Sequence, residues 1–77
     1  MKILARELGA NIRAKRKDMG ISQDDLALDC GVDRSYMGRI ERGEVNITLK
    51  KLYSIAWALS CETAALLPPV AVIKSQD

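Results

Sequence analysis

The chain of 77 residues is long enough for one domain with a small hydrophobic core. Hydrophobic residues make up 48% of it, which is typical of a globular protein and excludes a wholly disordered chain. No stretch of about 18 consecutive apolar residues is present to span a membrane, and the charged N-terminus lacks the apolar run of a signal peptide. These features predict a soluble, cytoplasmic protein.

The formal net charge is only +2, but the basic side chains are clustered along the chain. Residues 1–20 carry six basic side chains against two acidic ones, whereas every charged residue within 22–29 is acidic. Basic residues then return from residue 34 onward. Clustered basic charge in so small a domain is a weak indication of a nucleic-acid partner.

The residues that support most enzyme and metal chemistry are missing. The chain has no histidine, and therefore lacks the usual general base. Asp24 and Asp25 are adjacent, so on a helix they point about 100° apart and cannot act as a carboxylate pair. The only cysteines, Cys30 and Cys61, form no C-x-x-C pair and are expected to be unpaired and buried. We therefore expect no enzyme activity, cofactor, metal or small-molecule ligand.

Helical periodicity runs through most of the chain, with glycine or proline between the segments. The predicted helices cover about residues 3–18, 23–29, 34–42, 49–59 and, as a short fifth segment, 62–67. Ser22, Asp33 and Thr48 each precede one of these helices and are expected to cap it. The pattern is therefore that of an all-helical domain.

Three details of this pattern concern Met19, Leu49 and the run at residues 70–73. Met19 continues the apolar spacing of the first helix and Leu49 that of the fourth, so both are expected to face inward. The run VAVI at 70–73 follows a double proline that ends the fifth segment. It is the only run with the β-branched pattern of a strand.

The third predicted helix has a divided surface when its residues are placed about 100° apart. Tyr36, Met37 and Ile40 form a buried stripe. The opposite face is expected to consist of Arg34, Ser35, Gly38, Arg39 and Arg42. Such a face is either ordinary solvated surface, which usually mixes both charges, or a surface that contacts something negative. Gly38 costs the helix about 1 kcal/mol relative to alanine, which makes sense where another group approaches the backbone closely.

Residues 23–42 also carry the pattern of two crossing helices. Ala27 is small enough for a tight crossing, and Gly31 permits a left-handed turn between the helices. The stretch GVDRSYMGRIERG, with LGANIRAKRKDMGISQDDLA before it and TLKKLYSIAWALSCETAALL after it, resembles the helix-turn-helix of the Cro and phage-repressor family. Within that family, DRSYMGRIERGEVN is most similar to restriction–modification controller proteins. Glu44 and Val45 stand where those proteins often carry a basic residue.

The resemblance implies an all-α, compact five-helix lambda-repressor-like fold. The single domain would cover 1–77, with the helix-turn-helix at 23–42. It also implies a sequence-specific transcriptional regulator that binds double-stranded DNA as a homodimer on a pseudopalindromic operator. Control of a restriction–modification system and phage-type repression are two forms of this role. The alternative from a different class is an antitoxin-type module that holds a partner toxin.

The resemblance assigns roles to three groups of residues. The residues implied to contact bases are Arg34, Ser35 and Arg39. The residues implied to contact phosphates are Gln23, Tyr36 and Arg42. The implied structural pair between the first and third helices is Arg16 and Glu41. Tyr36 also belongs to the buried stripe, so a phosphate contact and a core position are both open for it.

The C-terminal part of the chain is expected to form the dimer interface. One small helix-turn-helix reads only a few base pairs, so two copies on half-sites about one DNA turn apart are needed. A solvated tail would leave the consecutive apolar residues beyond the double proline exposed to water, which is unfavourable. The predicted interface is centred on Leu66 and Leu67, with Val70 and Val72 or Ile73 packing on them.

Overall fold

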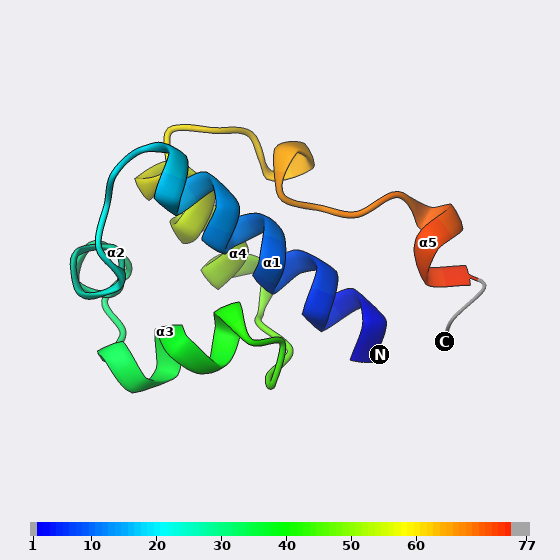
Figure 1. The fold of residues 1–77 in the computed structure, drawn as a ribbon, viewed down its shortest axis with the longest axis horizontal. Helices are drawn as coiled ribbons and strands as arrows, with labels where there is room; N and C mark the ends of the chain where they lie inside the picture. Colours follow the sequence, from blue (N-terminus) through cyan, green and yellow to red (C-terminus); the bar gives the residue numbers. More distant parts are fainter. Residues whose placement is uncertain (1, 75–77) are drawn as a thin grey trace.

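The computed structural model describes residues 2–74, and this part of the chain is helical without strands. Its elements are α1 (Lys2–Asp18), α2 (Gln23–Cys30), α3 (Arg34–Glu41), α4 (Leu49–Ala58), the 3-10 turn η1 (Thr63–Ala65) and α5 (Val70–Lys74). Figure 1 shows α1 crossing in front of α4, with α2 and α3 joined at one end of the molecule and α5 at the other. The predicted all-α, five-helix fold is confirmed. Residues 1 and 75–77 of the expected domain lie outside the described residues.

Three of the helices begin at a capping side chain, as their sequences predicted. Ser22 Oγ accepts a hydrogen bond from the backbone N–H of Asp25 at 3.0 Å. Asp33 Oδ1 accepts from Tyr36 N–H at 2.7 Å, and Thr48 Oγ1 accepts from the corresponding N–H at the start of α4 at 3.1 Å. Each such cap contributes about 1 kcal/mol to helix stability and fixes the residue at which the helix begins. The caps therefore set the register of α2 and α3 relative to the turn between them.

The turn between α2 and α3 depends on one glycine. Gly31 has φ 68° and ψ 31°, in the left-handed region that residues with a Cβ seldom adopt. The chain reverses tightly there, and the Val32 N–H donates to the carbonyl of Ala27 at 3.0 Å. Ala27 itself is 2% exposed. The small residue and the left-handed glycine predicted for this crossing are both confirmed.

The hydrophobic core lies between α1, α2, α3 and α4 and includes one residue of the C-terminal segment. Its fully buried larger side chains are Ile12, Leu26, Met37, Ile55, Leu59 and Leu66. Burial of each contributes about 1.5–3 kcal/mol, so the inner face of α3 is firmly held. The outer face of α3 lies along the bottom of the molecule in Figure 1 and is left free.

A close backbone contact also holds α3 against α1. A Cβ on Gly9 would lie 2.7 Å from the carbonyl oxygen of Glu41 and would also contact that of Ile40. Such a separation is far below van der Waals contact, so only glycine lets α1 approach α3 this closely. The position of α3 is thus set by a backbone contact with α1 as well as by the packing of its side chains.

Several predicted details are wrong. Met19 is 39% exposed because α1 ends at Asp18 and the chain turns away. Leu49, the first residue of α4, is 75% exposed, although Leu52 one turn further along the helix is buried. Residues 70–73, the one run with a β-branched pattern, form most of the helix α5, which packs against α1.

Candidate nucleic-acid interface

One face of α3 carries most of the residues that the sequence singled out. Arg34, Ser35 and Arg39 are exposed, as is Arg42, the residue that caps the C-terminus of α3. A shallow hollow of about 600 Å³ lies over this face. It is lined by Gln23, Arg34, Ser35, Gly38, Arg39 and Arg42. The tertiary fold therefore brings five of the six predicted DNA-contacting residues to a single surface.

Tyr36 is the sixth and differs from the others. It is half-buried and packs against the hydrophobic core, beside the fully buried Met37. Tyr36 is absent from the lining of the hollow. The structure favours the core position for most of this side chain.

Gly38 was expected on the open face, but it is buried. A Cβ built there would lie 2.9 Å from Arg42 Nη1 and 3.5 Å from Gln23 Oε1. The groups that approach its backbone are therefore side chains of the same chain. Any larger residue at this position would displace Arg42, and the glycine lets Gln23 and Arg42 fold over the middle of α3.

Arg16 and Glu41 form the buried pair that joins α1 to α3. Arg16 Nε lies 2.7 Å from Glu41 Oε2, and Arg16 Nη2 donates to Glu41 Oε1 at 3.1 Å. Arg16 Nη1 donates to the carbonyl of Ile21 at 2.9 Å, and Gln23 Nε2 donates to Glu41 Oε1 at 3.0 Å. The hydrogen bonds that Arg16 donates to Glu41 raise the pKa of Arg16, against the opposing effect of burial. The pair fixes the Gln23 side chain at the edge of the hollow.

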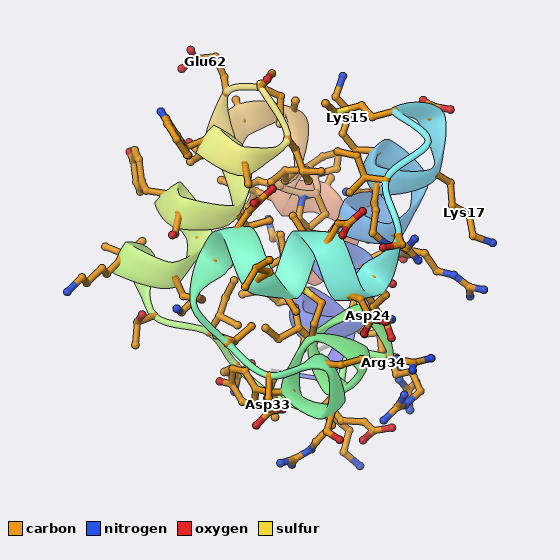
Figure 2. All side chains as sticks on the ribbon, turned by 90° about the vertical axis from the view of Figure 1, so that its left-hand side faces the viewer. Lys15, Lys17, Asp24, Asp33, Arg34 and Glu62 are labelled. Atoms are coloured by element: carbon orange, nitrogen blue, oxygen red, sulfur yellow. The ribbon has the colours of Figure 1, made fainter. Side chains whose placement is uncertain are left out.

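Exposed acidic side chains flank the arginines of α3. Arg34 Nε lies 3.3 Å from Asp24 Oδ1, and Figure 2 shows these two residues side by side at the starts of α3 and α2. Arg42 Nε lies 2.7 Å from Glu44 Oε2, and Arg39 Nε lies 3.7 Å from Glu44 Oε1. The hydrogen bond from Arg42 lowers the pKa of Glu44 and raises that of Arg42. The basic face is thus bordered by Asp24 and Glu44, which lie outside α3 and which the helical spacing of α3 could not place beside it.

Arg13 is a further basic residue at this surface that the sequence did not single out. A second hollow of about 270 Å³ adjoins the first and shares three lining residues with it. Its lining comprises Arg13, Arg16, Gln23, Gly38, Glu41 and Arg42. The signal was the spacing of Arg13 three residues before Arg16, which puts both on one side of α1. The basic surface therefore extends from α3 onto α1.

The predicted dimer residues are divided between surface and core. Leu66 is 0% exposed and belongs to the core of this chain, so its prediction as the centre of an interface is wrong. Leu67 and Val70 are exposed at 42% and 78%, and Val72 is half-buried. Leu66 is covered because the chain folds back over α1, where Asn11 Nδ2 donates to its carbonyl at 2.8 Å.

A second exposed apolar group was not predicted. Leu49, Tyr53 and Trp57 follow one another at intervals of four residues along α4, and each is more than 60% exposed. Four-residue spacing puts them on one side of the helix, and we call them the α4 stripe. Exposed aromatic residues in a row are unusual on the surface of a protein without partners.

The two cysteines are free, with Cys30 buried and Cys61 half-buried. Burial raises the pKa of the Cys30 thiol, so the reactive thiolate is disfavoured there. Within residues 2–74, no group of histidine, cysteine or acidic side chains is arranged to hold a metal ion. Over the same residues, no helix is long and apolar enough to cross a membrane.

Two helices that cross at a left-handed glycine, with the second exposing an arginine-rich face, define a lambda-repressor-like helix-turn-helix domain. A family model described as "Helix-turn-helix" matches residues 12–66. This chain belongs to that helix-turn-helix family. The match covers α2 and α3, which line the hollow over the basic face, and the whole of α4.

Three comparisons place the chain among known proteins. The hypothetical transcription factor of Neisseria meningitidis serogroup B is 40% identical over 62 residues, which cover 80% of this chain and 58% of that protein. The restriction–modification controller protein C.AhdI from Aeromonas hydrophila has a TM-score of 0.76 and 39% identity, over 79% of this chain and 92% of that one. The P22 c2 repressor in complex with a synthetic operator has a TM-score of 0.74 and 32% identity, over 80% of this chain and 94% of that one.

Proposed function

We propose that this protein is a transcriptional regulator that binds double-stranded DNA in a sequence-specific manner. The observation that carries the proposal is the larger hollow over α3, where three arginines, a serine and Gln23 line one exposed surface. An arginine-rich helix held by its opposite face fits the major groove and the phosphates beside it. The named controller and repressor proteins that share this fold support the same role.

The roles within the surface follow from position along α3. Arg34 and Ser35 are in the first turn, where a recognition helix meets base edges, and Arg39 follows one turn later. Arginine recognises guanine through two hydrogen bonds to O6 and N7. Gln23 and Arg42 lie at the edges of the hollow and are suited to phosphates, as is Arg13 in the adjoining hollow. Tyr36 keeps at most a minor part in this scheme because most of its side chain packs on the core.

We further propose that the regulator acts as a cytoplasmic homodimer on two DNA half-sites. Two groups of exposed apolar side chains lie outside α3: the α4 stripe, and Leu67 with Val70 after the core ends. A second copy that covers either group would remove apolar surface from water. The α4 stripe is the stronger candidate because it contains Tyr53 and Trp57, and aromatic residues are enriched at interfaces.

Sedimentation velocity at micromolar concentration separates the two surfaces. Wild type is compared with Trp57→Ala and with a chain truncated after Leu67. A dimer that only Trp57→Ala weakens assigns the α4 stripe, and one that only truncation weakens assigns the C-terminal segment. A monomeric wild type contradicts the homodimer.

Selection of bound sequences from random DNA, followed by a footprint, tests the DNA-binding proposal itself. We expect a pseudopalindromic consensus with half-sites about one DNA turn apart. Failure to enrich any sequence contradicts sequence-specific binding. A neighbouring gene for a restriction enzyme and methyltransferase would favour the controller role over phage-type repression, and a neighbouring toxin gene would favour an antitoxin.

A further inference from the structure

Glu44 is the first acidic residue after α3, and the backbone holds it against the arginines of the basic face. Its N–H donates to the carbonyl of Arg39 at 2.9 Å, immediately after Gly43, which has φ 73°. Its carboxylate contacts Arg42 through both oxygens, at 2.7 Å from Nε and 3.5 Å from Nη2. The same carboxylate lies 3.7 Å from Arg39 Nε. One acid therefore faces two of the arginines that line the hollow.

The contacts have the geometry that a DNA phosphate would take. A guanidinium prefers two parallel hydrogen bonds to the oxygens of a carboxylate or a phosphate, so the two anions compete for the same donors. Both partners are largely exposed, with side-chain exposed fractions of 60% for Arg42 and 48% for Glu44. Exposed pairs of this kind are weak, so a phosphate is able to displace the carboxylate.

We propose that Glu44 is an internal competitor of DNA phosphate that occupies Arg42 and partly neutralises Arg39 in the free protein. The inference rests on the proposed DNA-binding function. Binding to an arbitrary duplex comes from contacts between cations and phosphates, and from the counterions that these contacts release. An arginine already held by a carboxylate contributes less to that binding, and a carboxylate left beside a phosphate repels it.

The consequence is a lower affinity for DNA of any sequence. On an arbitrary duplex, only phosphate contacts offset the loss of the contact between Arg42 and Glu44. On the cognate operator, Arg39 adds a base contact that arbitrary DNA does not supply. Glu44 therefore lowers the affinity for every duplex, while the base contact of Arg39 determines how far the operator is preferred.

The test uses the full chain and a labelled duplex of mixed sequence, with affinity measured by fluorescence anisotropy over a series of salt concentrations. In Glu44→Gln the side chain keeps its size and loses its charge. We expect affinity to rise by up to about eightfold near 0.1 M salt, and the salt slope to steepen by about 0.9, the values for one added phosphate contact. Circular dichroism checks that the variant is folded.

The matched control is Glu62→Gln. Glu62 is also exposed, and Figure 2 shows it on the opposite side of the view from Arg34. The Glu62→Gln variant makes the same change in net charge at a residue outside α3. We expect it to raise affinity much less than Glu44→Gln does. Equal gains in the two variants overturn the inference, because net charge alone would then explain them.

Two further outcomes are decisive. An unchanged or weaker affinity of Glu44→Gln overturns the inference, and a weaker one would mean that Glu44 orients the arginines for DNA. A wild type that binds no duplex even at low salt overturns the proposed function, and the inference with it. In an Arg42→Gln background, the gain from Glu44→Gln should shrink, and an undiminished gain overturns the competition for Arg42.

Discussion

Two arginine–glutamate pairs at the C-terminal end of α3 have the same short contact distance but opposite surroundings. In the pair between Arg16 and Glu41, Nε lies 2.7 Å from Oε2, and the side-chain exposed fractions are 11% and 2%. In the pair between Arg42 and Glu44, the same two atoms are also 2.7 Å apart, but the exposed fractions are 60% and 48%. Contact distance therefore does not distinguish a structural pair from an exchangeable one. Burial does, because water and DNA can replace only the exposed partner.

The largest effect is expected from breaking the buried pair. Glu41→Ala leaves Arg16 charged and without its partner inside the protein, which should lower the free energy of unfolding by about 3–5 kcal/mol. Urea denaturation measures this loss. The double variant Arg16→Met/Glu41→Leu removes both charges and should recover most of the stability. A loss below about 1 kcal/mol in Glu41→Ala would contradict the difference between the two pairs.

The next effect concerns binding and leaves folding unchanged. Arg39→Ala should weaken binding to the selected operator by about 1–3 kcal/mol and relax base preference, since it removes a base contact. Arg13→Ala, which removes the phosphate contact proposed at the adjoining hollow, should weaken binding to all sequences alike and flatten the salt slope by about 1. Titration of both variants against operator and scrambled duplexes gives the comparison. Equal losses on the two duplexes for Arg39→Ala would show that Arg39 does not read bases.

Breaking the exposed pair should leave stability unchanged. Glu44→Ala removes a carboxylate that water replaces at once, so we expect the midpoint of urea denaturation to stay where it is in wild type. Glu41→Ala in the same experiment is the matched comparison. A clear shift in the midpoint for Glu44→Ala would mean that Arg42 and Glu44 also support the fold.

The smallest effect is expected from the cysteines. The buried Cys30 has a raised pKa, and neither cysteine is near the hollow on α3. Affinity for DNA should therefore be the same in reducing buffer and under mild oxidant. A reversible loss of binding under oxidant would identify one of these thiols as a redox sensor.

Local features of this fold could be predicted from the sequence, because each depends on residues close together in the chain. The caps at Ser22, Asp33 and Thr48 and the left-handed Gly31 belong to this class. The arginine face of α3 does too, since helical spacing alone separates it from the buried stripe. The family resemblance added Arg16 with Glu41, a pair that spacing did not reveal.

The remaining features depend on segments that are distant in sequence. The backbone contact at Gly9 exists only once α1 lies on α3, and the burial of Leu66 follows from the path of the chain across α1. The reach of Glu44 back to Arg39 and Arg42 depends on the turn after α3. Leu49 was misplaced because helical spacing gives the buried face of α4 but not how far along the helix the core covers that face.

Trp57 is the only tryptophan of the chain and is 80% exposed on α4, while the chain has no phenylalanine. Its indole already contacts water in the folded monomer, so unfolding should change its fluorescence little. Burial by another molecule on the α4 stripe would instead shift the emission to the blue. The protein thus carries an intrinsic optical probe that reports association at α4 and is nearly silent to denaturation. Dilution of an unlabelled sample can therefore follow self-association directly.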